Sequence, residues 1–377
     1  MKNIIERPFE HLSRRENGKK FEEGIVKNWY IARAFILEML KDVAFKPGSN
    51  EHLHVIVMYD SPLMLSIVRQ IALSAHYINY NEESEEESMR NRTIITLVSN
   101  NPGIKNELEK EEYLCNLPKY CKYSGSDLVT ENKDSYIDIE IRITSDVSEE
   151  DKKKCGFVFT EENVKDFCKK KMSDGIDIFG IDTRKAIYTS RIYNLGYSID
   201  NLPAEDIHST SRYIMALNVF QYSRLKVHPK PIIEEYIRED QGRIKEFLSN
   251  IFCSDCFESR YKSIMLCSNG DKKRERHLWE KNNEALSRSE HARWVVEKLI
   301  MGYCPLNPRQ RFKDESLLYD TRKKAQYRRS LKCNESAPTH IDLCSYRDLR
   351  RINPNDMKYD SFLMLAIPKI LEKIKDE

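Results

Sequence analysis

The densest group of side chains that could do chemistry is a basic stretch over residues 309–332. It contains nine basic and three acidic residues, a local net charge of +6, with Tyr319 and Tyr327 interleaved among them. Arginine and lysine in such a patch can hold phosphate by bidentate contacts or by Coulomb attraction. A small phosphorylated ligand is favoured over nucleic acid, because the rest of the chain is not basic. Arg309 and Arg311 are the predicted ligand contacts, and a solvated loop is the structural alternative.

A Cys-x-x-Cys pair, Cys253 and Cys256, is the candidate for metal or redox chemistry. Such a pair is half of a zinc site, and no second pair of ligands follows at the required spacing. A redox role would place the pair beside a βαβ unit, which the flanking sequence does not offer. We therefore predict no metal and no cofactor. The usual motifs of serine hydrolases, zinc proteases and P-loop enzymes are also missing, so a binding function is favoured over catalysis.

A third candidate site follows a strand that the pattern predicts over residues 176–181. Gly180, Asp182 and Arg184 would then lie at the carboxyl end of this strand, where open α/β sheets bind ligands. This crevice is the basis of an alternative function, an enzyme acting on a nucleotide or phosphorylated substrate. The structural alternative is that Gly180 serves only as a turn residue.

The elements that must position these residues begin with an α/β pattern. Residues 22–42 have the periodicity of an amphipathic helix. A strand over 54–59, a helix that opens at Ser61 and Pro62, and a strand over 93–98 form a βαβ unit, which indicates an α/β sheet. A further strand is predicted over 136–143, where isoleucines alternate and one face should be solvated.

The first βα turn contains no glycine, although a dinucleotide site needs glycines there so that the pyrophosphate can approach the backbone. The turn reads Met-Tyr-Asp-Ser-Pro-Leu over residues 58–63, and Pro62 removes an N–H that could donate to phosphate. The sequence therefore predicts a Rossmann-like scaffold without its usual cofactor. Instead of contacting a ligand, Asp60 could have a structural role at the N-cap of the helix.

The composition predicts a cytoplasmic protein. The 377 residues are 40% hydrophobic and 32% charged, and the net charge of +2 gives no global attraction to nucleic acid or membrane. Ten cysteines without regular spacing are typical of a reducing compartment. The first residues do not resemble a signal peptide and no stretch is apolar enough to enter a bilayer, so no direct membrane insertion is expected. The acidic run at 82–87 is interpreted as a solvated loop.

The C-terminal quarter has a distinctive helix over residues 284–303. Leu286, Trp294 and Leu299 mark its buried side, and Gly302 is placed as its terminator. Further helical patterns follow from about residue 277 onward, with the basic stretch between them as a loop.

This quarter resembles a ryanodine-receptor-like (RyR) domain, of which about residues 284–368 carry the resemblance. The family has a Glu-His-x-x-Trp core, which matches the segment from Glu290 to Trp294. Its His-x-x-Leu-x-x-Tyr-x-x-Leu stretch matches residues 340–349, and its closing Tyr-Asp and Ile-Pro steps match residues 359–360 and 367–368. Ser345 stands where the family often has proline, and the basic stretch is longer than the family leads us to expect.

Upstream, the order of segments is similar to bacterial proteins that join a potassium-uptake-regulator-type Rossmann domain to an RyR domain. The segment Glu258-Ser259-Arg260 is a partial match to their Glu-Ser-Asn-Arg-like motif, and Phe179-Gly180 matches a Phe-Gly step. The expected fold class is an α/β Rossmann-like domain plus a mainly α-helical C-terminal RyR domain. The expected division is an N-terminal helical segment (1–50), the Rossmann-like domain (51–200), a helical connector (201–280) and the RyR-like domain (281–377).

The resemblance implies a contact-forming, helical domain that pairs with a second copy, so we expect a homodimer. It also implies a bacterial regulatory protein that binds a nucleotide-type small molecule and signals to an effector partner. Antiphage defence is one setting for such a protein. The other alternative is a pure assembly module without a ligand. The aromatic residues of the motifs are either core residues or pocket residues. In the second interpretation the ligand contacts are His291, Arg293, Trp294, Tyr303, His340, Tyr346 and Arg347.

Overall fold

The computed structural model describes most of the chain, which divides into two compact units. The sheet unit comprises residues 48–160 and 288–357, and the helical unit comprises residues 1–47, 161–287 and 358–377. The described residues are 5–6, 23–110, 112–125, 128–130, 136–178, 181–182, 184–186, 188–189, 241–268, 271–332, 334, 338–354 and 356–376.

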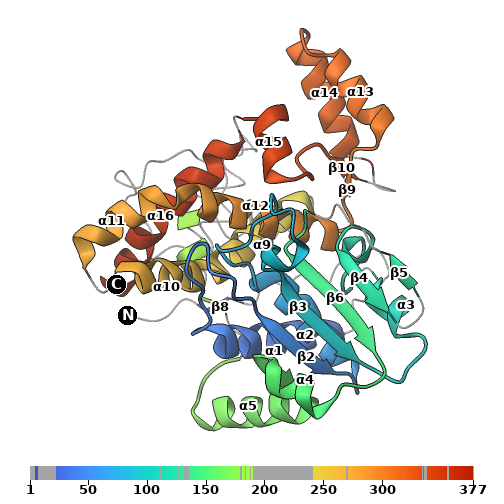
Figure 1. Cartoon of the computed structure of the whole chain (residues 1–377), viewed down its shortest axis with the longest axis vertical. Coiled ribbons are helices and arrows are strands. Elements are labelled where there is room, and N and C mark those ends of the chain that lie inside the picture. Colours follow the sequence, from blue (N-terminus) through green and yellow to red (C-terminus); the bar gives the residue numbers. More distant parts are fainter. Residues whose placement is uncertain are drawn as a thin grey trace, which may run out of the picture. The chain divides into compact units, whose positions relative to one another are not determined.

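The sheet unit is built on a six-stranded sheet with the order β5-β4-β6-β3-β2-β7 (Figure 1). Five of its strands are parallel neighbours, and β5 pairs antiparallel with β4. The strands are β2 (His54–Met58), β3 (Thr93–Val98), β4 (Lys122–Gly125), β5 (Leu128–Thr130), β6 (Ile139–Thr144) and β7 (Phe157–Phe159). The parallel α/β class expected from the βαβ pattern is confirmed.

Strand β6 differs from its prediction. It lies between β3 and β4 in the interior of the sheet, and the isoleucine face is buried as expected. The opposite side is buried too, because Glu140 on β6 and Asp138 just before it are 6% and 2% exposed. The prediction from alternating polar and apolar residues that one face is solvated is therefore wrong. The two carboxylates on this face form ion pairs, including those with Lys122 and His76, in place of contacts with water.

Helix α2 (Pro62–Ser74) follows β2 directly and packs on β2 and β3. Pro62 occupies its first turn, and the N-cap is Ser61, whose side chain makes no capping hydrogen bond. The absence of glycine from this turn is thus compatible with an ordinary helix start. The shorter helical elements of the same half are η1 (Glu87–Arg90), α3 (Ile104–Leu108), η2 (Leu117–Lys119) and α4 (Glu149–Lys154).

The C-terminal residues of the sheet unit begin in α12 (Asn283–Ile300), which Gly302 ends as predicted. Gly302 has a φ of +87°, and the N–H groups of Gly302 and Tyr303 donate to the carbonyls of Leu299 and Lys298. This double pattern is a Schellman cap, which needs a left-handed residue at the position of Gly302. The elements that follow are β9 (Cys304–Pro305), α13 (Pro308–Ser316), α14 (Thr321–Lys332), β10 (Thr339–His340) and α15 (Tyr346–Ile352).

The basic stretch is a pair of helices, α13 and α14, and the prediction of a loop is wrong. Asn307 caps α13 with a capping box, in which its side chain accepts from the Gln310 backbone and the Gln310 side chain accepts from the Asn307 backbone. Asp314 of α13 is 2% exposed and accepts two hydrogen bonds from Arg328 of α14. The high charge of this stretch is typical of a loop, but several of its cations pair with acids inside the hairpin and so stabilise helices instead.

The helical unit consists of α1 (Glu23–Leu40), α5 (Glu161–Ser173), α9 (Gln241–Asp255), α10 (Phe257–Ser268), α11 (Lys272–Lys281), the start of α12 and α16 (Met357–Asp376). Helix α1 confirms the predicted helix over 22–42 and packs against α5 and α9 through pairs of aromatic rings, Phe35 with Phe167 and Trp29 with Phe252. Arg33 of α1 also forms an ion pair with Asp255.

The predicted strand over 176–181 is wrong in its bounds. Residues 176–178 are not in a strand, and β8 (Ile181–Asp182) pairs antiparallel with β1 (Ile5–Glu6), outside the six-stranded sheet. Of the predicted helical connector over 201–280, the residues before Gln241 lie outside the described residues. Across the described part of the chain, no helix has the length and apolar character that crossing a membrane requires.

Candidate ligand-binding site

Two aromatic side chains of the sheet unit meet around His340, and we call Trp294, Tyr303 and His340 the aromatic cluster. Strands β9 and β10 pair in parallel and place His340 opposite Pro305, two residues after Tyr303. The His340 ring lies edge-on to Trp294, with ring centroids 4.9 Å apart, and 6.5 Å from the ring of Tyr303. His340 is buried, whereas Trp294 and Tyr303 are each partly exposed. The cluster therefore offers aromatic surface to a ligand as well as a packed interior.

The charges of three cations act on His340, and we call Lys298, Arg328 and Lys332 the basic rim. The Lys298 ammonium lies 5.7 Å from the centroid of the Trp294 ring. Burial lowers the pKa of His340 well below its usual value, and the positive charges of Lys332, Lys298 and Arg328 lower it further. His340 is therefore neutral at physiological pH, and the cations stand near enough to attract a phosphate to the same place.

Two carboxyl groups, Asp342 and Asp356, form a pair next to His340. The Asn353 side-chain amide donates to both, at 3.1 Å to Asp342 and 2.6 Å to Asp356. Burial and the neighbouring Asp342 carboxyl raise the pKa of Asp356 to about 6. The Nδ1 atom of His340 accepts from the backbone N–H of Asp342 at 3.2 Å. The pair can hold a shared proton, or accept hydrogen bonds from ligand hydroxyls.

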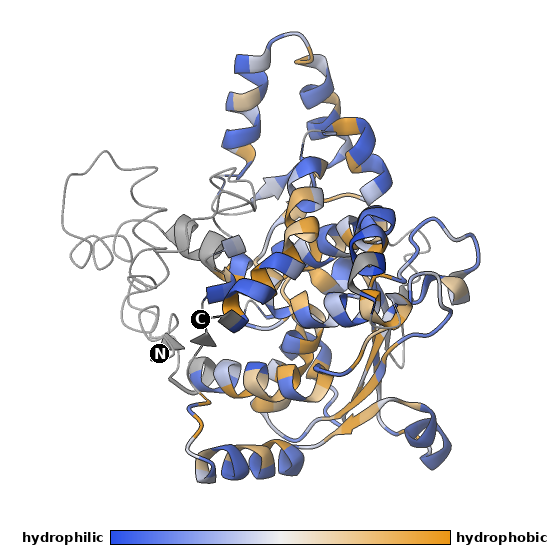
Figure 2. Ribbon diagram, turned by 90° about the vertical axis from the view of Figure 1, so that its left-hand side faces the viewer, coloured by the Kyte–Doolittle hydropathy of each residue, from blue (hydrophilic) through white to orange (hydrophobic). Residues whose placement is uncertain are grey.

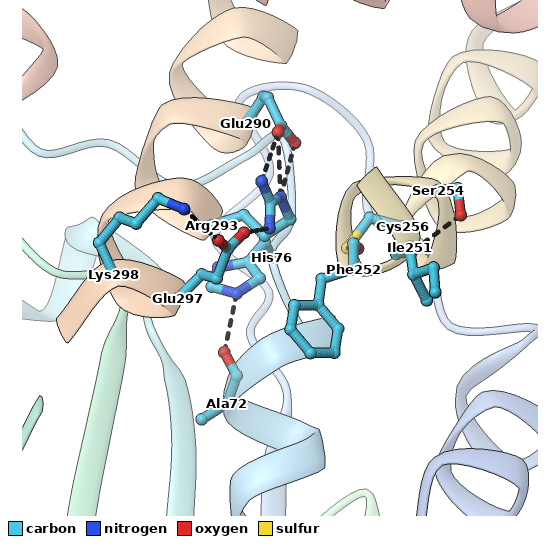
Figure 3. Close-up of polar contacts among 10 residues, drawn as sticks. All are labelled: Ala72, His76, Ile251, Phe252, Ser254, Cys256, Glu290, Arg293, Glu297 and Lys298. Atoms are coloured by element: carbon cyan, nitrogen blue, oxygen red, sulfur yellow. Dashed lines mark hydrogen bonds and ion pairs between the residues drawn. The ribbon is translucent and has the colours of Figure 1, made fainter. Parts of the chain in front are cut away.

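Arg293, the residue before Trp294 on α12, lies in a buried ion network (Figure 3). Its guanidinium donates to Glu290 at 2.8 Å and to Glu297 at 2.6 Å, and all three side chains are at most 2% exposed. Lys298 completes the network by pairing with Glu297 at 2.7 Å. Burial alone would raise the pKa of Glu297, but Lys298 and Arg293 outweigh it and hold the pKa below its usual value. The guanidinium of Arg293, a predicted ligand contact, is thus bound by two carboxylates of its own helix.

His291 and Tyr346 lie on the interior side of the cluster. Nε2 of His291 donates to the Cys344 carbonyl at 2.9 Å, and burial lowers the pKa of His291 to about 4. The ring stacks on Trp294 at 6.1 Å and lies 5.8 Å from the ring of Tyr346. Tyr346 belongs to a small apolar cluster with Cys344 and Leu349. His291 is therefore placed to orient Trp294, and Tyr346 is placed to orient His291.

Arg347 and the two predicted arginines of α13 lie at the edges. The Arg347 side chain is exposed, and its backbone N–H donates to Glu82 at 2.8 Å. Arg309 is exposed at the start of α13. Burial raises the pKa of both Tyr136 and Cys344, and the positive charge of Arg311 acts against both shifts, so Arg311 lies close to these two residues.

Glu82 departs from the solvated acidic loop that the sequence predicted. Its carboxylate accepts from the backbone N–H groups of Tyr346 and Arg347, and so caps α15. Glu83 and Glu85 are exposed as expected. Glu82 therefore connects the segment between α2 and β3 to the RyR-like residues of the same unit.

Asp182 and Arg184 belong to the helical unit and not to the residues around His340. Gly180 lies outside the described residues, and Asp182 is in β8. Arg184 donates to the backbone carbonyl of Ile374 at 3.5 Å. Because β8 is not part of the six-stranded sheet, a crevice at its carboxyl edge is no longer supported.

The sequence did not single out Lys298, Asp342, Asn353 or Asp356. Asp342 lies two residues after His340 in the quoted motif, which was the available signal. Asn353 and Asp356 follow α15 without any pattern of their own. Arg328 and Lys332 were part of the basic stretch but were not distinguished from its other cations.

Cys253 and Cys256 are buried in the helical unit, and the Cys256 thiol donates to the Phe252 carbonyl at 3.6 Å. Among the residues that the structure describes, no group of three or more histidine, cysteine or acidic side chains is arranged to hold a metal ion.

No family model, curated protein or solved structure matches the chain. The RyR resemblance therefore depends on the motifs quoted above.

Proposed function

We propose that the chain is a ligand-binding regulatory protein whose RyR-like residues take a nucleotide-type small molecule at the aromatic cluster. The observation that carries this proposal is the combination of the aromatic cluster with the basic rim. A nucleotide offers a flat aromatic base, hydroxyl groups and phosphate. Around His340, the aromatic rings match the base, the carboxyl pair matches the hydroxyl groups and the basic rim matches the phosphate. Homodimerisation, a cytoplasmic location, an effector partner and a part in antiphage defence stay predictions from the resemblance.

The partly exposed rings of Trp294 and Tyr303 suit a base, because stacking on an aromatic side chain contributes about 1–3 kcal/mol per base. Lys332 suits the phosphate. It is exposed at the end of α14 and forms no ion pair with the described residues, whereas Lys298 and Arg328 already pair with Glu297 and Asp314. A phosphate would therefore meet one cation without an ion-pair partner among the described residues, which would exchange the weaker attraction of Asp342 and Asp356 for that of the phosphate.

A regulatory role is supported by the way in which this region joins the sheet. The Asn116 amide donates to the carbonyls of Gly302 and Tyr303 at 2.8 and 3.2 Å, and the Asn116 backbone N–H donates to Leu299 at 3.2 Å. A ligand that orders Tyr303 would also order the segment beside η2. Ligand binding is thereby coupled to the conformation of the loop that contains Asn116 and η2.

Thermal denaturation of the full chain with ATP, NAD, ADP-ribose and cyclic di-AMP tests the proposal. We expect at least one of them to raise the melting temperature by about 2 °C or more at saturating concentration. Lys332→Gln should abolish the shift. Arg329→Gln removes the same charge from an exposed position of the same helix and should leave the shift unchanged. No shift with any of these ligands, or equal loss in both variants, contradicts the proposal.

The carboxyl pair favours a second function, an enzyme acting on a nucleotide or phosphorylated substrate. A carboxyl group with a pKa of about 6 is suited to general acid–base catalysis near neutral pH. Incubation with the same nucleotides followed by chromatography distinguishes the two functions. Turnover that Asp356→Asn abolishes would replace the regulatory proposal, and unchanged nucleotides would leave binding alone.

A further inference from the structure

The turn between α13 and α14 presents apolar side chains to solvent, and we call residues 312–319 the hairpin tip. Phe312, Leu318 and Tyr319 are 74%, 59% and 97% exposed. In the sheet unit the hairpin points away from β9 and β10, and its mostly hydrophilic ribbon is interrupted by hydrophobic segments (Figures 1 and 2). Full exposure of an aromatic ring beside an exposed leucine is unfavourable in water unless something covers it.

Positive charge surrounds the tip. Lys313, Arg322 and Lys323 lie within a few residues of the turn and are exposed. Acidic residues offset part of it, since Glu315 is exposed and Asp320 pairs with Lys323, but residues 309–332 as a whole carry a net charge of +6. The hairpin that carries the apolar tip is therefore cationic as a whole.

The hairpin has enough internal contacts to hold the tip exposed. Arg328 donates two hydrogen bonds, of 2.8 and 2.9 Å, to the Asp314 carboxylate. Tyr327 of α14 donates its hydroxyl to the Gln310 carbonyl, and the Lys313 ammonium lies 4.6 Å from the Tyr327 ring centroid. These contacts join the two helices along their length, so Phe312, Leu318 and Tyr319 do not need to fold back for the hairpin to form.

We propose that the hairpin tip docks on an anionic lipid surface. The order of side chains from the turn into α14 matches the depth order of a bilayer, since Leu318 and Tyr319 stand at the turn and Arg322 and Lys323 stand in the first turn of α14. Leucine and aromatic side chains enter the boundary between headgroups and acyl chains, while lysine and arginine remain at the phosphates. A nucleic acid is less well matched, because Leu318 has no ring on which a base could stack. No described helix can span a membrane, so this contact is peripheral.

Vesicle flotation of the full chain tests this proposal. We expect binding to vesicles of phosphatidylcholine mixed with phosphatidylglycerol and none to phosphatidylcholine alone. Binding should weaken as salt rises, because screening reduces the attraction of the cations. Failure to bind the mixed vesicles at low ionic strength overturns the proposal.

Matched variants locate the contact. Leu318→Ser combined with Tyr319→Ser should lower the partition coefficient at least about tenfold, as should Arg322→Glu combined with Lys323→Glu. Leu266→Ser and Arg276→Glu change an exposed leucine and an exposed arginine of the helical unit, and should leave binding unchanged. Vesicle binding that is indifferent to the tip variants overturns the proposal. So does binding of single-stranded RNA that the tip variants abolish while the vesicles remain unbound.

Discussion

At the scale of single residues, Arg293 shows why motif residues need not be ligand contacts. It lies in the quoted Glu-His-x-x-Trp segment, and its charge is satisfied by Glu290 and Glu297 in the interior. A buried charge that loses its partners costs far more than an exposed one. The sequence showed that Glu290 and Arg293 are neighbours on a helix, but not that both are buried, because burial depends on what packs over α12.

We expect Arg293→Met to lower the free energy of unfolding by about 3–5 kcal/mol, because it leaves Glu290 and Glu297 buried without their cation. Arg276→Met is the control, since Arg276 is 88% exposed and meets Glu280 at 3.4 Å; its effect should stay within about 0.5 kcal/mol. Urea denaturation of both variants measures the difference. Equal losses would show that the network does not stabilise the fold.

The pair of Asp342 and Asp356 predicts a particular dependence on pH. The folded pKa of Asp356 is about 6 against an ordinary value of 3.8, so the folded chain holds this proton more tightly than the unfolded chain. The stabilisation from this group is full below about pH 4 and is lost as the pH rises through about 6.

Asp356→Asn should therefore gain stability relative to the native chain as the pH rises from about 4 to 7. The gain should be about 1 kcal/mol, less than the full shift would give, because solvent screens a partly exposed carboxyl. Asp348→Asn, in the nearby helix α15, should show no such trend. Urea denaturation across this range measures the difference in stability between the two proteins. The histidines whose pKa values are lowered contribute equally to both proteins, so they cancel in this difference. Parallel profiles for the native chain and Asp356→Asn would contradict the assignment.

At the scale of elements, local patterns predicted α1, β2 and β3 to within two residues, because caps, turns and apolar periodicity are properties of short segments. The hairpin of α13 and α14 was missed, since its high charge is typical of loops and its ion pairs join residues 14 apart. The role of Glu82 was missed for the same reason, because the α15 backbone it caps lies more than 260 residues away.

Glu82→Ala should destabilise the sheet unit by about 1–2 kcal/mol, because the first N–H groups of α15 lose their acceptors. Glu83→Ala, at an exposed neighbouring position, should cost less than about 0.5 kcal/mol. Hydrogen exchange of the α15 amides gives the local measurement. Unchanged protection of α15 in Glu82→Ala would show that the cap contributes nothing.

The hairpin makes a second prediction at this scale. Asp314→Ala leaves Arg328 and Lys324 without their shared acid, so the amides of α13 and α14 should exchange at least about tenfold faster. Glu315→Ala removes an exposed acid from the next position and should leave exchange unchanged. If the two variants behave alike, the internal ion pairs do not hold the helices together.

At the scale of the whole molecule, the sequence predicted an α/β sheet followed by helices, and the structure has both. It did not anticipate that residues 288–357 group with the sheet while residues 358–377 group with the helical unit. Such a division depends on contacts between distant segments, for example Asn116 with Gly302 and Tyr136 with the Leu343 carbonyl. The aromatic half of the candidate site was predicted from motifs, whereas its carboxyl pair was not.

The most direct test of nucleotide binding at the aromatic cluster is a fluorescence titration of the full chain with ATP, NAD, ADP-ribose and cyclic di-AMP. The chain has three tryptophans, and Trp29 and Trp279 belong to the helical unit. We predict that at least one nucleotide quenches the emission in a saturable way, and that Trp294→Phe removes this quenching. Titrations without a saturable change, or quenching that persists in Trp294→Phe, would contradict nucleotide binding at this cluster.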